Sequence, residues 1–128
     1  MAFTYDRDDG RRRITITTDR EITLEDVRAI VDRQVADGAW SYALLYDSRE
    51  TTTFPAPVAI ADVIALVRAY ASSKGRRGPV AIVTHSPSVF GIARQYGVVE
   101  SDVGPVGFFA DRAAAETWLR QVGGAGSE

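Results

Sequence analysis

The chain of 128 residues contains no cysteine and only one histidine, His85. Without cysteine it can form no disulfide, thiolate metal site or thiol nucleophile, and a single histidine excludes a multi-histidine metal centre. We therefore expect no metal and no cofactor. No apolar run approaches the roughly 18 residues of a membrane-spanning helix, and residues 1–6 lack the basic and apolar blocks of a secretory signal. The expectation is a cytoplasmic protein without an integral membrane segment.

The chain also lacks an excess of charge of either sign. It has 15 basic and 17 acidic residues, which gives a net charge of −2. Nucleic-acid-binding proteins usually show a clear basic excess, so we expect no nucleic-acid partner. A hydrophobic fraction of 45% and a charged fraction of 25% are typical of a globular protein. We expect a single domain over residues 1–122 and a disordered glycine-rich tail over residues 123–128.

Short β-branched or aliphatic runs alternate with helix-forming segments four times along the chain. The expected strands are residues 14–18, 43–46, 80–84 and 106–109, and the expected helices are 23–37, 57–73, 86–96 and 111–122. Parallel neighbours cannot be joined by a tight turn, so this order predicts parallel strands with helical crossovers. Alternating residues on both sides of Asp9-Gly10 predict a further hairpin at the N-terminus. The fold class is therefore α/β, with a mostly parallel sheet of about five strands.

Several of these helices carry clear end signals. Thr23 is a good N-cap, and Asp26 has the spacing of a capping-box acid. Gly38 fits a left-handed stop at the end of the same helix. Ser86 and Asp111 are the N-caps expected for the third and fourth helices.

Two basic segments have a simple interpretation. The run Arg11-Arg12-Arg13 begins the returning strand of the hairpin, where positive charge opposes aggregation at a solvated edge. Residues 74–78, which include two arginines, are interpreted as a solvated turn after the second helix. These structural interpretations are favoured, and anion binding by Arg11-Arg12-Arg13 is the less favoured alternative.

The second expected helix is unusually apolar, since only Asp62 and Arg68 are charged between residues 57 and 73. A helix of this kind needs cover on more than one side. It is either packed deeply between the sheet and neighbouring helices, or it forms a contact surface for a partner or a second copy. The candidate interface residues are Phe54, Pro55, Val58, Ile60 and Tyr70.

Polar residues follow two of the expected strands, at the edge of a parallel sheet where ligands generally bind. The candidate ligand or partner loop consists of Asp47, Ser48, Arg49, His85 and Ser86. A catalytic interpretation makes Asp47 and His85 a polar pair with a serine as nucleophile. The sequence has neither a glycine-flanked nucleophile elbow nor a Walker phosphate loop, so we favour a structural role and assign no catalytic residue.

The order of these features resembles the anti-sigma-factor antagonist (STAS) domains and their SpoIIAA-like relatives, and in particular a bacterial branch described as STAS/SEC14-like. The matching features, spread over residues 14–119, are the Tyr46-Asp47 strand end, the Val-Ala-Ile-Val strand at 80–83, the helix start at 89–94, and the ending Phe109, Asp111, Ala115, Trp118 and Leu119. The resemblance implies a four-turn β-α superhelix, and a non-enzymatic regulatory module that binds a protein partner or forms a homodimer.

In antagonist STAS domains a serine at the start of the helix after the Asp-ending strand is phosphorylated by a partner kinase. The corresponding stretch here, residues 54–58, contains no hydroxyl group. Ser48 and Thr51–Thr53 lie nearby but are displaced from the helix start. We therefore expect no phosphorylation switch of the antagonist type.

Two other functions remain open at this point. One is binding of a small apolar or lipid-like ligand, by analogy of fold to CRAL-TRIO domains, although the chain lacks the extra helices that usually enclose such a ligand. The other is a small hydrolase or transferase that uses Asp47, His85 and a serine, which requires the nucleophile to lie within hydrogen-bond reach of its base.

Overall fold

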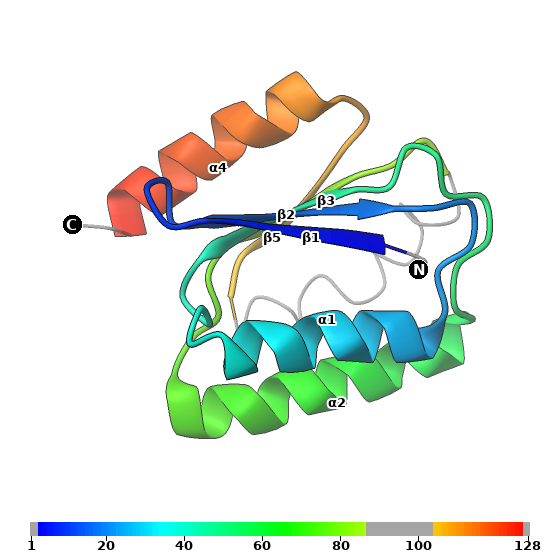
Figure 1. Cartoon of the computed structure of the whole chain (residues 1–128), viewed down its shortest axis with the longest axis horizontal. Coiled ribbons are helices and arrows are strands. Elements are labelled where there is room, and N and C mark those ends of the chain that lie inside the picture. The colour runs from blue at the N-terminus through cyan, green and yellow to red at the C-terminus, as the bar shows by residue number, and fades with distance from the viewer. Residues whose placement is uncertain (1–2, 87–103, 127–128) are drawn as a thin grey trace.

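The computed structural model describes residues 3–86 and 104–126, without the side chains of Pro57, Ile60 and residues 123–126. A five-stranded sheet in the order β1-β2-β3-β4-β5 forms the centre, with helices on both faces (Figure 1). The strands are β1 (Phe3–Asp8), β2 (Arg13–Thr18), β3 (Ala43–Asp47), β4 (Val80–Val83) and β5 (Val106–Phe109), and the helices are α1 (Leu24–Ala36), α2 (Pro57–Lys74) and α4 (Arg112–Gly126).

The sheet topology confirms the fold predicted from the sequence. β1 and β2 form an antiparallel hairpin, and β2, β3, β4 and β5 are parallel to one another. The hairpin turn follows Asp8, and the Arg12 N–H donates to the Asp9 carbonyl at 3.3 Å. The register places Leu44 of β3 opposite Ile14 of β2 and Val80 of β4. This α/β sheet is mostly parallel and has the predicted N-terminal hairpin.

Helix α1 covers one face of the sheet and has the predicted ends. Thr23 accepts a hydrogen bond from the Asp26 N–H, and the Asp26 carboxylate accepts one from the Thr23 N–H, which completes the capping box. Gly38 has the left-handed φ of 68° that stops the helix. The fully buried Ile30 belongs to the core cluster that this face forms with residues of β2 and β3, such as Ile14 and Leu44. This core fixes α1 against the sheet.

Helix α2 lies alongside α1 and contributes to a separate apolar cluster (Figure 1). Val67 of α2 is buried with Val31 of α1 and with Trp40. Much of the apolar surface of α2 is therefore covered by other parts of the same chain. This agrees with the interpretation that the helix packs against its neighbours. The outward side of the helix stays exposed, and Val58 is 78% accessible.

Helix α4 covers the opposite face, over β3, β4 and β5 (Figure 1). Ala115 and Leu119 pack there with Leu45, Ala81 and Val83. Asp111 caps the helix as predicted, since its carboxylate accepts a hydrogen bond from the Ala114 N–H at 2.7 Å.

Helix α4 continues to Gly126, beyond the predicted domain end at Val122. A glycine in a helix costs only about 1 kcal/mol relative to alanine, so a packed helix can extend into a glycine-rich stretch. Of the tail 123–128, residues 127–128 lie outside the described residues, as does the predicted third helix 86–96 except for Ser86. No helix in the described part of the chain is long and apolar enough to cross a membrane.

Candidate functional site

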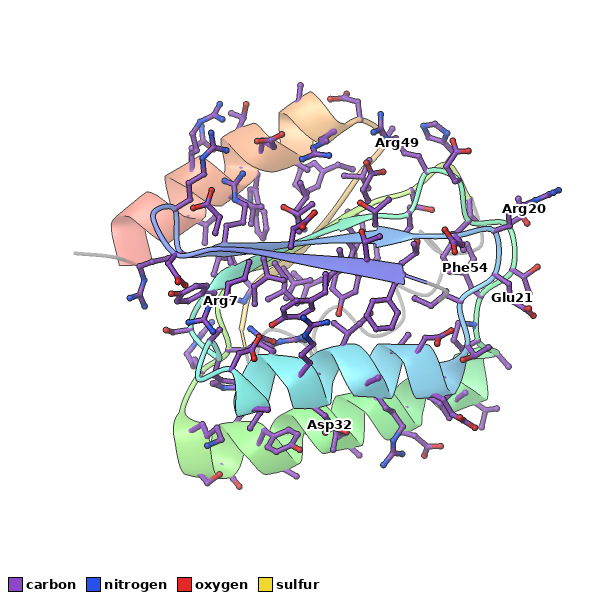
Figure 2. All side chains as sticks on the ribbon, viewed as in Figure 1. Arg7, Arg20, Glu21, Asp32, Arg49 and Phe54 are labelled. Carbon is purple, nitrogen blue, oxygen red and sulfur yellow. The ribbon has the colours of Figure 1, made fainter. Side chains whose placement is uncertain are left out.

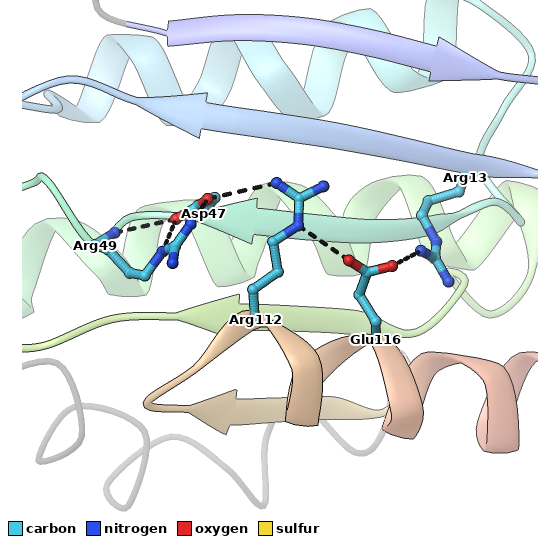
Figure 3. Close-up of polar contacts among 5 residues, drawn as sticks. All are labelled: Arg13, Asp47, Arg49, Arg112 and Glu116. Carbon is cyan, nitrogen blue, oxygen red and sulfur yellow. Dashed lines mark hydrogen bonds and ion pairs between the residues drawn. The ribbon is translucent and has the colours of Figure 1, made fainter.

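The Asp47 carboxylate, at the end of β3, is held by two arginines (Figure 3). Arg49 donates to both oxygens, from Nε to Oδ1 at 2.8 Å and from Nη2 to Oδ2 at 2.7 Å. Arg112, the first residue of α4, places Nη1 3.6 Å from Oδ2. The hydrogen bonds from Arg49 are the main reason why the pKa of Asp47 is lowered from its ordinary value. Asp47 is therefore a charged anchor for its own loop and for α4.

Glu116 of α4 extends this row of charges across the face of the sheet (Figure 3). Its Oε2 accepts from Arg112 Nε at 3.1 Å, and its Oε1 accepts from Arg13 Nη1 at 3.0 Å. Burial by itself would raise the pKa of Glu116, but the hydrogen bonds from the two arginines outweigh it and the net pKa is lowered. The result is an alternating ionic row of Arg49, Asp47, Arg112, Glu116 and Arg13. Arg112 and Glu116 were not among the site residues expected from the sequence, although their i,i+4 spacing is a local signal of a pair.

Ser48 belongs to a buried cluster of hydroxyl groups. The Thr18 Oγ1 lies 3.0 Å from Ser48 Oγ and 2.5 Å from Thr51 Oγ1, and Thr51 donates to the Asp19 carbonyl at 2.5 Å. Thr18, Ser48 and Thr51 are each at most 5% exposed. The cluster ties the loop after β3 to the loop after β2, and it offers no accessible nucleophile.

His85 and Ser86 follow β4 at the same edge of the sheet. His85 is exposed, and the Ser86 N–H donates to Thr84 Oγ1 at 3.1 Å. Among the described residues, no hydrogen bond or ion pair joins His85 to Asp47 or to Ser48. The partners of Asp47 are Arg49 and Arg112, and the partner of Ser48 is Thr18. In the same part of the chain, no group of three or more histidine and acidic side chains is placed to hold a metal ion.

The start of α2 contains the candidate interface residues. Phe54 is half-buried against the core on the α1 side, Pro55 is half-buried, and Val58 is exposed. Tyr70 is used within the protein, since its hydroxyl donates to Asp32 of α1 at 2.7 Å and its ring lies 5.7 Å from that of Trp40. The side chain of Ile60 lies outside the described residues.

The end of the molecule with Phe54 also carries the loops at the carboxyl ends of β2 and β3. Figure 2 shows Phe54 at the same end as Arg20 and Glu21, and Arg7 at the opposite end. The Ile22 N–H donates to the Thr53 carbonyl at 3.0 Å, so the loop that leads into α2 is attached to the loop that leads into α1.

Comparison with known proteins places this arrangement in a known fold. No family model and no curated protein sequence matches the chain. A structure of an uncharacterised DUF3478-family protein from Shewanella loihica, described as having a SpoIIAA-like fold, matches with a TM-score of 0.58 and 20% identity, covering 92% of each chain. The chain has a SpoIIAA-like fold.

Two further structures with this fold are anti-sigma factor antagonists. SpoIIAA in its unphosphorylated form matches with a TM-score of 0.59 and 19% identity, over 93% of this chain and 98% of that chain. An anti-sigma factor antagonist from Mycobacterium paratuberculosis matches with a TM-score of 0.57 and 18% identity, over 92% of each chain. The resemblance stated from the sequence is thus confirmed at the level of the fold.

Proposed function

We propose that this chain is a non-enzymatic regulatory module that binds a protein partner through the start and the outward side of α2. The observation that carries the proposal is the exposure of Val58, at 78%, in the first turn of a helix that no side chain caps. A contiguous apolar patch on a protein surface marks a contact site, whereas a single exposed apolar side chain does not. Ala61, Ala65 and Ala69 extend the apolar surface of Val58 along the helix, and all three are exposed.

We call the surface formed by Val58, Ala61, Ala65 and Ala69 the α2 outer face. Their spacing places them along one side of the helix. Small side chains let the backbone of a partner helix or loop approach closely. Two solved structures with this fold are anti-sigma factor antagonists, a class named for its effect on another protein, which favours a heterologous protein as the occupant.

Partner binding by this module is proposed not to depend on phosphorylation at the helix start. The N-cap of α2 is Ala56, and no hydroxyl group is present between residues 54 and 58. Two of the nearby hydroxyl groups, on Ser48 and Thr51, are buried in the Thr18 cluster. Of the four hydroxyl-bearing residues Ser48, Thr51, Thr52 and Thr53, the two that are exposed to a kinase are Thr52 and Thr53.

The two other functions considered from the sequence have less support. The carboxylate required for catalysis, Asp47, is neutralised by Arg49 and Arg112, and Ser48 is bonded to Thr18 rather than to a base. A site for an apolar or lipid-like ligand would be an enclosed apolar cavity, whereas the hollow described below is open to solvent and has six arginines in its lining.

Site-specific photocrosslinking in the source cells tests this function. A photoreactive residue placed at Val58 or Ala65 should give a discrete adduct with one protein. The same residue at Ala113, an exposed position on α4 at the opposite face of the sheet, is the matched control. Val58→Glu should abolish the adduct formed from position 65, and Ala113→Glu should leave it unchanged. A pattern that is the same at positions 58, 65 and 113 would contradict the proposal, and an adduct of twice the chain mass would replace the heterologous partner by a second copy.

A kinase assay tests whether phosphorylation near the start of α2 regulates partner binding. Incubation of the purified protein with the kinases of the source cells should leave its intact mass unchanged. Stoichiometric phosphate on Thr52 or Thr53 that changes the crosslink at position 65 would show that the acceptor had moved.

A further inference from the structure

A second polar region lies at the amino ends of the parallel strands, opposite to the Asp47 loop. A hollow of about 850 Å³ opens there between the hairpin turn, the segments before β3 and β4, and the second half of α4. In Figure 1 the hairpin turn and the end of α4 meet at this end of the molecule. The charged residues that line the hollow are Arg11, Arg12, Arg13, Arg76, Arg77, Arg120 and Glu116.

Most of these arginines have no acidic partner in the described part of the chain. Arg12 donates to Ser41 Oγ at 2.9 Å, Arg77 to Gln34 Oε1 at 2.9 Å, and Arg120 to Thr117 Oγ1 at 3.2 Å. These partners are neutral. Arg76 is exposed, and it forms no hydrogen bond or ion pair with the described residues. Several like charges therefore surround one hollow in a chain whose net charge is −2.

The two remaining arginines have acidic neighbours. Arg13 pairs with Glu116, and Arg11 Nε lies 3.8 Å from Asp8 Oδ2 at an exposed position. Glu116 also serves Arg112, so its single charge is shared. Within the described lining, Glu116 is the only carboxylate, and the positive charge remains in excess.

Two of the lining arginines are buried and hold a donor without a partner. Arg13 is 9% exposed and Arg77 is 8% exposed. The Nε of Arg13 and the Nη2 of Arg77 are buried, and neither has a hydrogen-bond partner among residues 3–86 and 104–126. A buried donor of this kind costs free energy, and a charged one costs more. Negative charge brought into the hollow would interact favourably with both guanidinium charges.

The backbone at Gly78, in the lining of the hollow, packs tightly against residues 40–42. The Gly78 N–H donates to the Trp40 carbonyl at 3.0 Å, and a β-carbon on Gly78 would overlap the Tyr42 carbonyl oxygen. Arg77 is fixed beside it, since Gln34 of α1, itself fully buried, accepts from its Nε and the Trp40 ring lies 5.4 Å from its guanidinium carbon. At least one of the arginines is thus held in place before any ligand binds.

We propose that this hollow binds a small anion that carries several phosphate groups. Guanidinium groups pair with phosphate oxygens through two parallel N–H donors, so a group of arginines favours such ligands. The volume lies within the roughly 300–1,000 Å³ of small-molecule sites. The concave shape and the negative net charge of the chain favour a small molecule over a nucleic acid, which needs an extended basic surface. This site is separate from the α2 outer face and does not depend on the proposed function.

Isothermal titration of the whole chain with inorganic tripolyphosphate tests the proposal. The double variant Arg76→Gln/Arg120→Gln changes two exposed arginines of the hollow. The matched control, Arg20→Gln/Arg28→Gln, removes the same charge from exposed positions elsewhere, and Figure 2 shows Arg20 extending away from the molecule at the opposite end. We expect the first variant to bind at least about tenfold more weakly and the control to stay within about twofold of the original chain. Absence of binding by the original chain, or equal losses in both variants, would overturn the proposal.

A change of the opposite sign gives a second test. Glu116→Gln removes the carboxylate from the lining and should tighten tripolyphosphate binding severalfold, because Arg13 then has no anionic partner of its own. Unchanged or weaker binding by this variant, with its fold verified by circular dichroism, would contradict the assignment of the site.

The source of the phosphate groups can be distinguished in the same series. Vesicles of phosphatidylcholine with and without phosphatidic acid are sedimented with the chain. Binding to tripolyphosphate but not to either vesicle identifies a soluble ligand. Sedimentation that requires both phosphatidic acid and the arginines at 76 and 120 identifies a lipid headgroup as the source.

Discussion

The two ends of the parallel sheet differ in how their polar groups are satisfied. At the carboxyl end, Asp47 has two arginine partners, and Ser48 lies in a cluster of hydroxyl groups. At the amino end, arginines outnumber carboxylates among the described lining residues, and one buried donor each on Arg13 and Arg77 has no partner among the described residues. Ligands of open α/β sheets usually bind at the carboxyl end. Here the unpaired arginine donors lie at the amino end, so the usual position of a ligand in this kind of fold does not by itself locate a site.

Helix α4 connects the two ends. Its first residue, Arg112, contacts Asp47, and residues further along the helix, Glu116, Leu119 and Arg120, line the hollow. Changes in α4 should therefore affect both ends, whereas changes in one loop should affect only one. The predictions below use this distinction, beginning with the largest expected effect.

Loss of the apolar contact under α4 should disturb both ends together. Leu119 is 2% exposed and packs with Leu45, Ala81 and Val83. Leu119→Ala should lower the free energy of unfolding by about 2–5 kcal/mol, because it removes buried methyl groups and leaves a cavity. Urea unfolding measures the loss. Arg120→Ala, at the next and exposed position, should change stability by less than about 0.5 kcal/mol.

Removal of the carboxylate at the carboxyl end should have a smaller effect. Asp47→Ala leaves Arg49 and Arg112 without their shared acceptor and should lower the free energy of unfolding by about 1–2 kcal/mol. Asp62→Ala, at an exposed position on α2, is the control and should change stability by less than about 0.5 kcal/mol. An Asp47 variant as stable as the control would show that the ionic row does not anchor the loop.

The pH dependence of stability should report both carboxylates of the ionic row. Their pKa values in the folded chain are below the ordinary values of 3.8 for Asp47 and 4.5 for Glu116. Their contribution is therefore complete above those ordinary values and is lost as the pH falls through the lower folded values. Urea midpoints measured from pH 7 to pH 2 should fall below about pH 4.5, and Asp47→Asn should make that fall shallower. A fall of equal slope in Asp47→Asn would contradict the pairing of Asp47.

The smallest effect is expected at His85. The side chain is exposed, and no described contact joins it to Asp47. His85→Ala should therefore change the urea midpoint by no more than the scatter between repeat measurements, and the tripolyphosphate affinity should stay within about twofold. A large change in the urea midpoint or in the affinity would show that His85 contributes to stability or to ligand binding.

Local signals allowed much of the fold to be predicted from the sequence. The capping box of Thr23 and Asp26, the stop at Gly38, the cap at Asp111 and the turn after Asp8 each depend on residues within a few positions of one another. Such signals act through the backbone conformation and are read without knowledge of the tertiary fold.

The arginine site could not be predicted in this way. Residues 74–78 were interpreted as a solvated turn, and Arg11–Arg13 as a solvated edge with anion binding as the less favoured alternative. Arg13 and Arg77 are in fact buried. Arg13 pairs with Glu116 at a separation of 103 positions, and Arg77 with Gln34 at a separation of 43. Tertiary packing brings these partners together, and neither composition nor periodicity contains that information.

Mapping of backbone amide shifts by NMR during titration with tripolyphosphate tests the contrast between the two ends most directly. The account predicts the largest shift changes at residues 11–13, 76–78 and 119–122, with little change at 47–49 and 85–86. Larger changes at 47–49 and 85–86 than at the arginine hollow, or no change at either end, would contradict it.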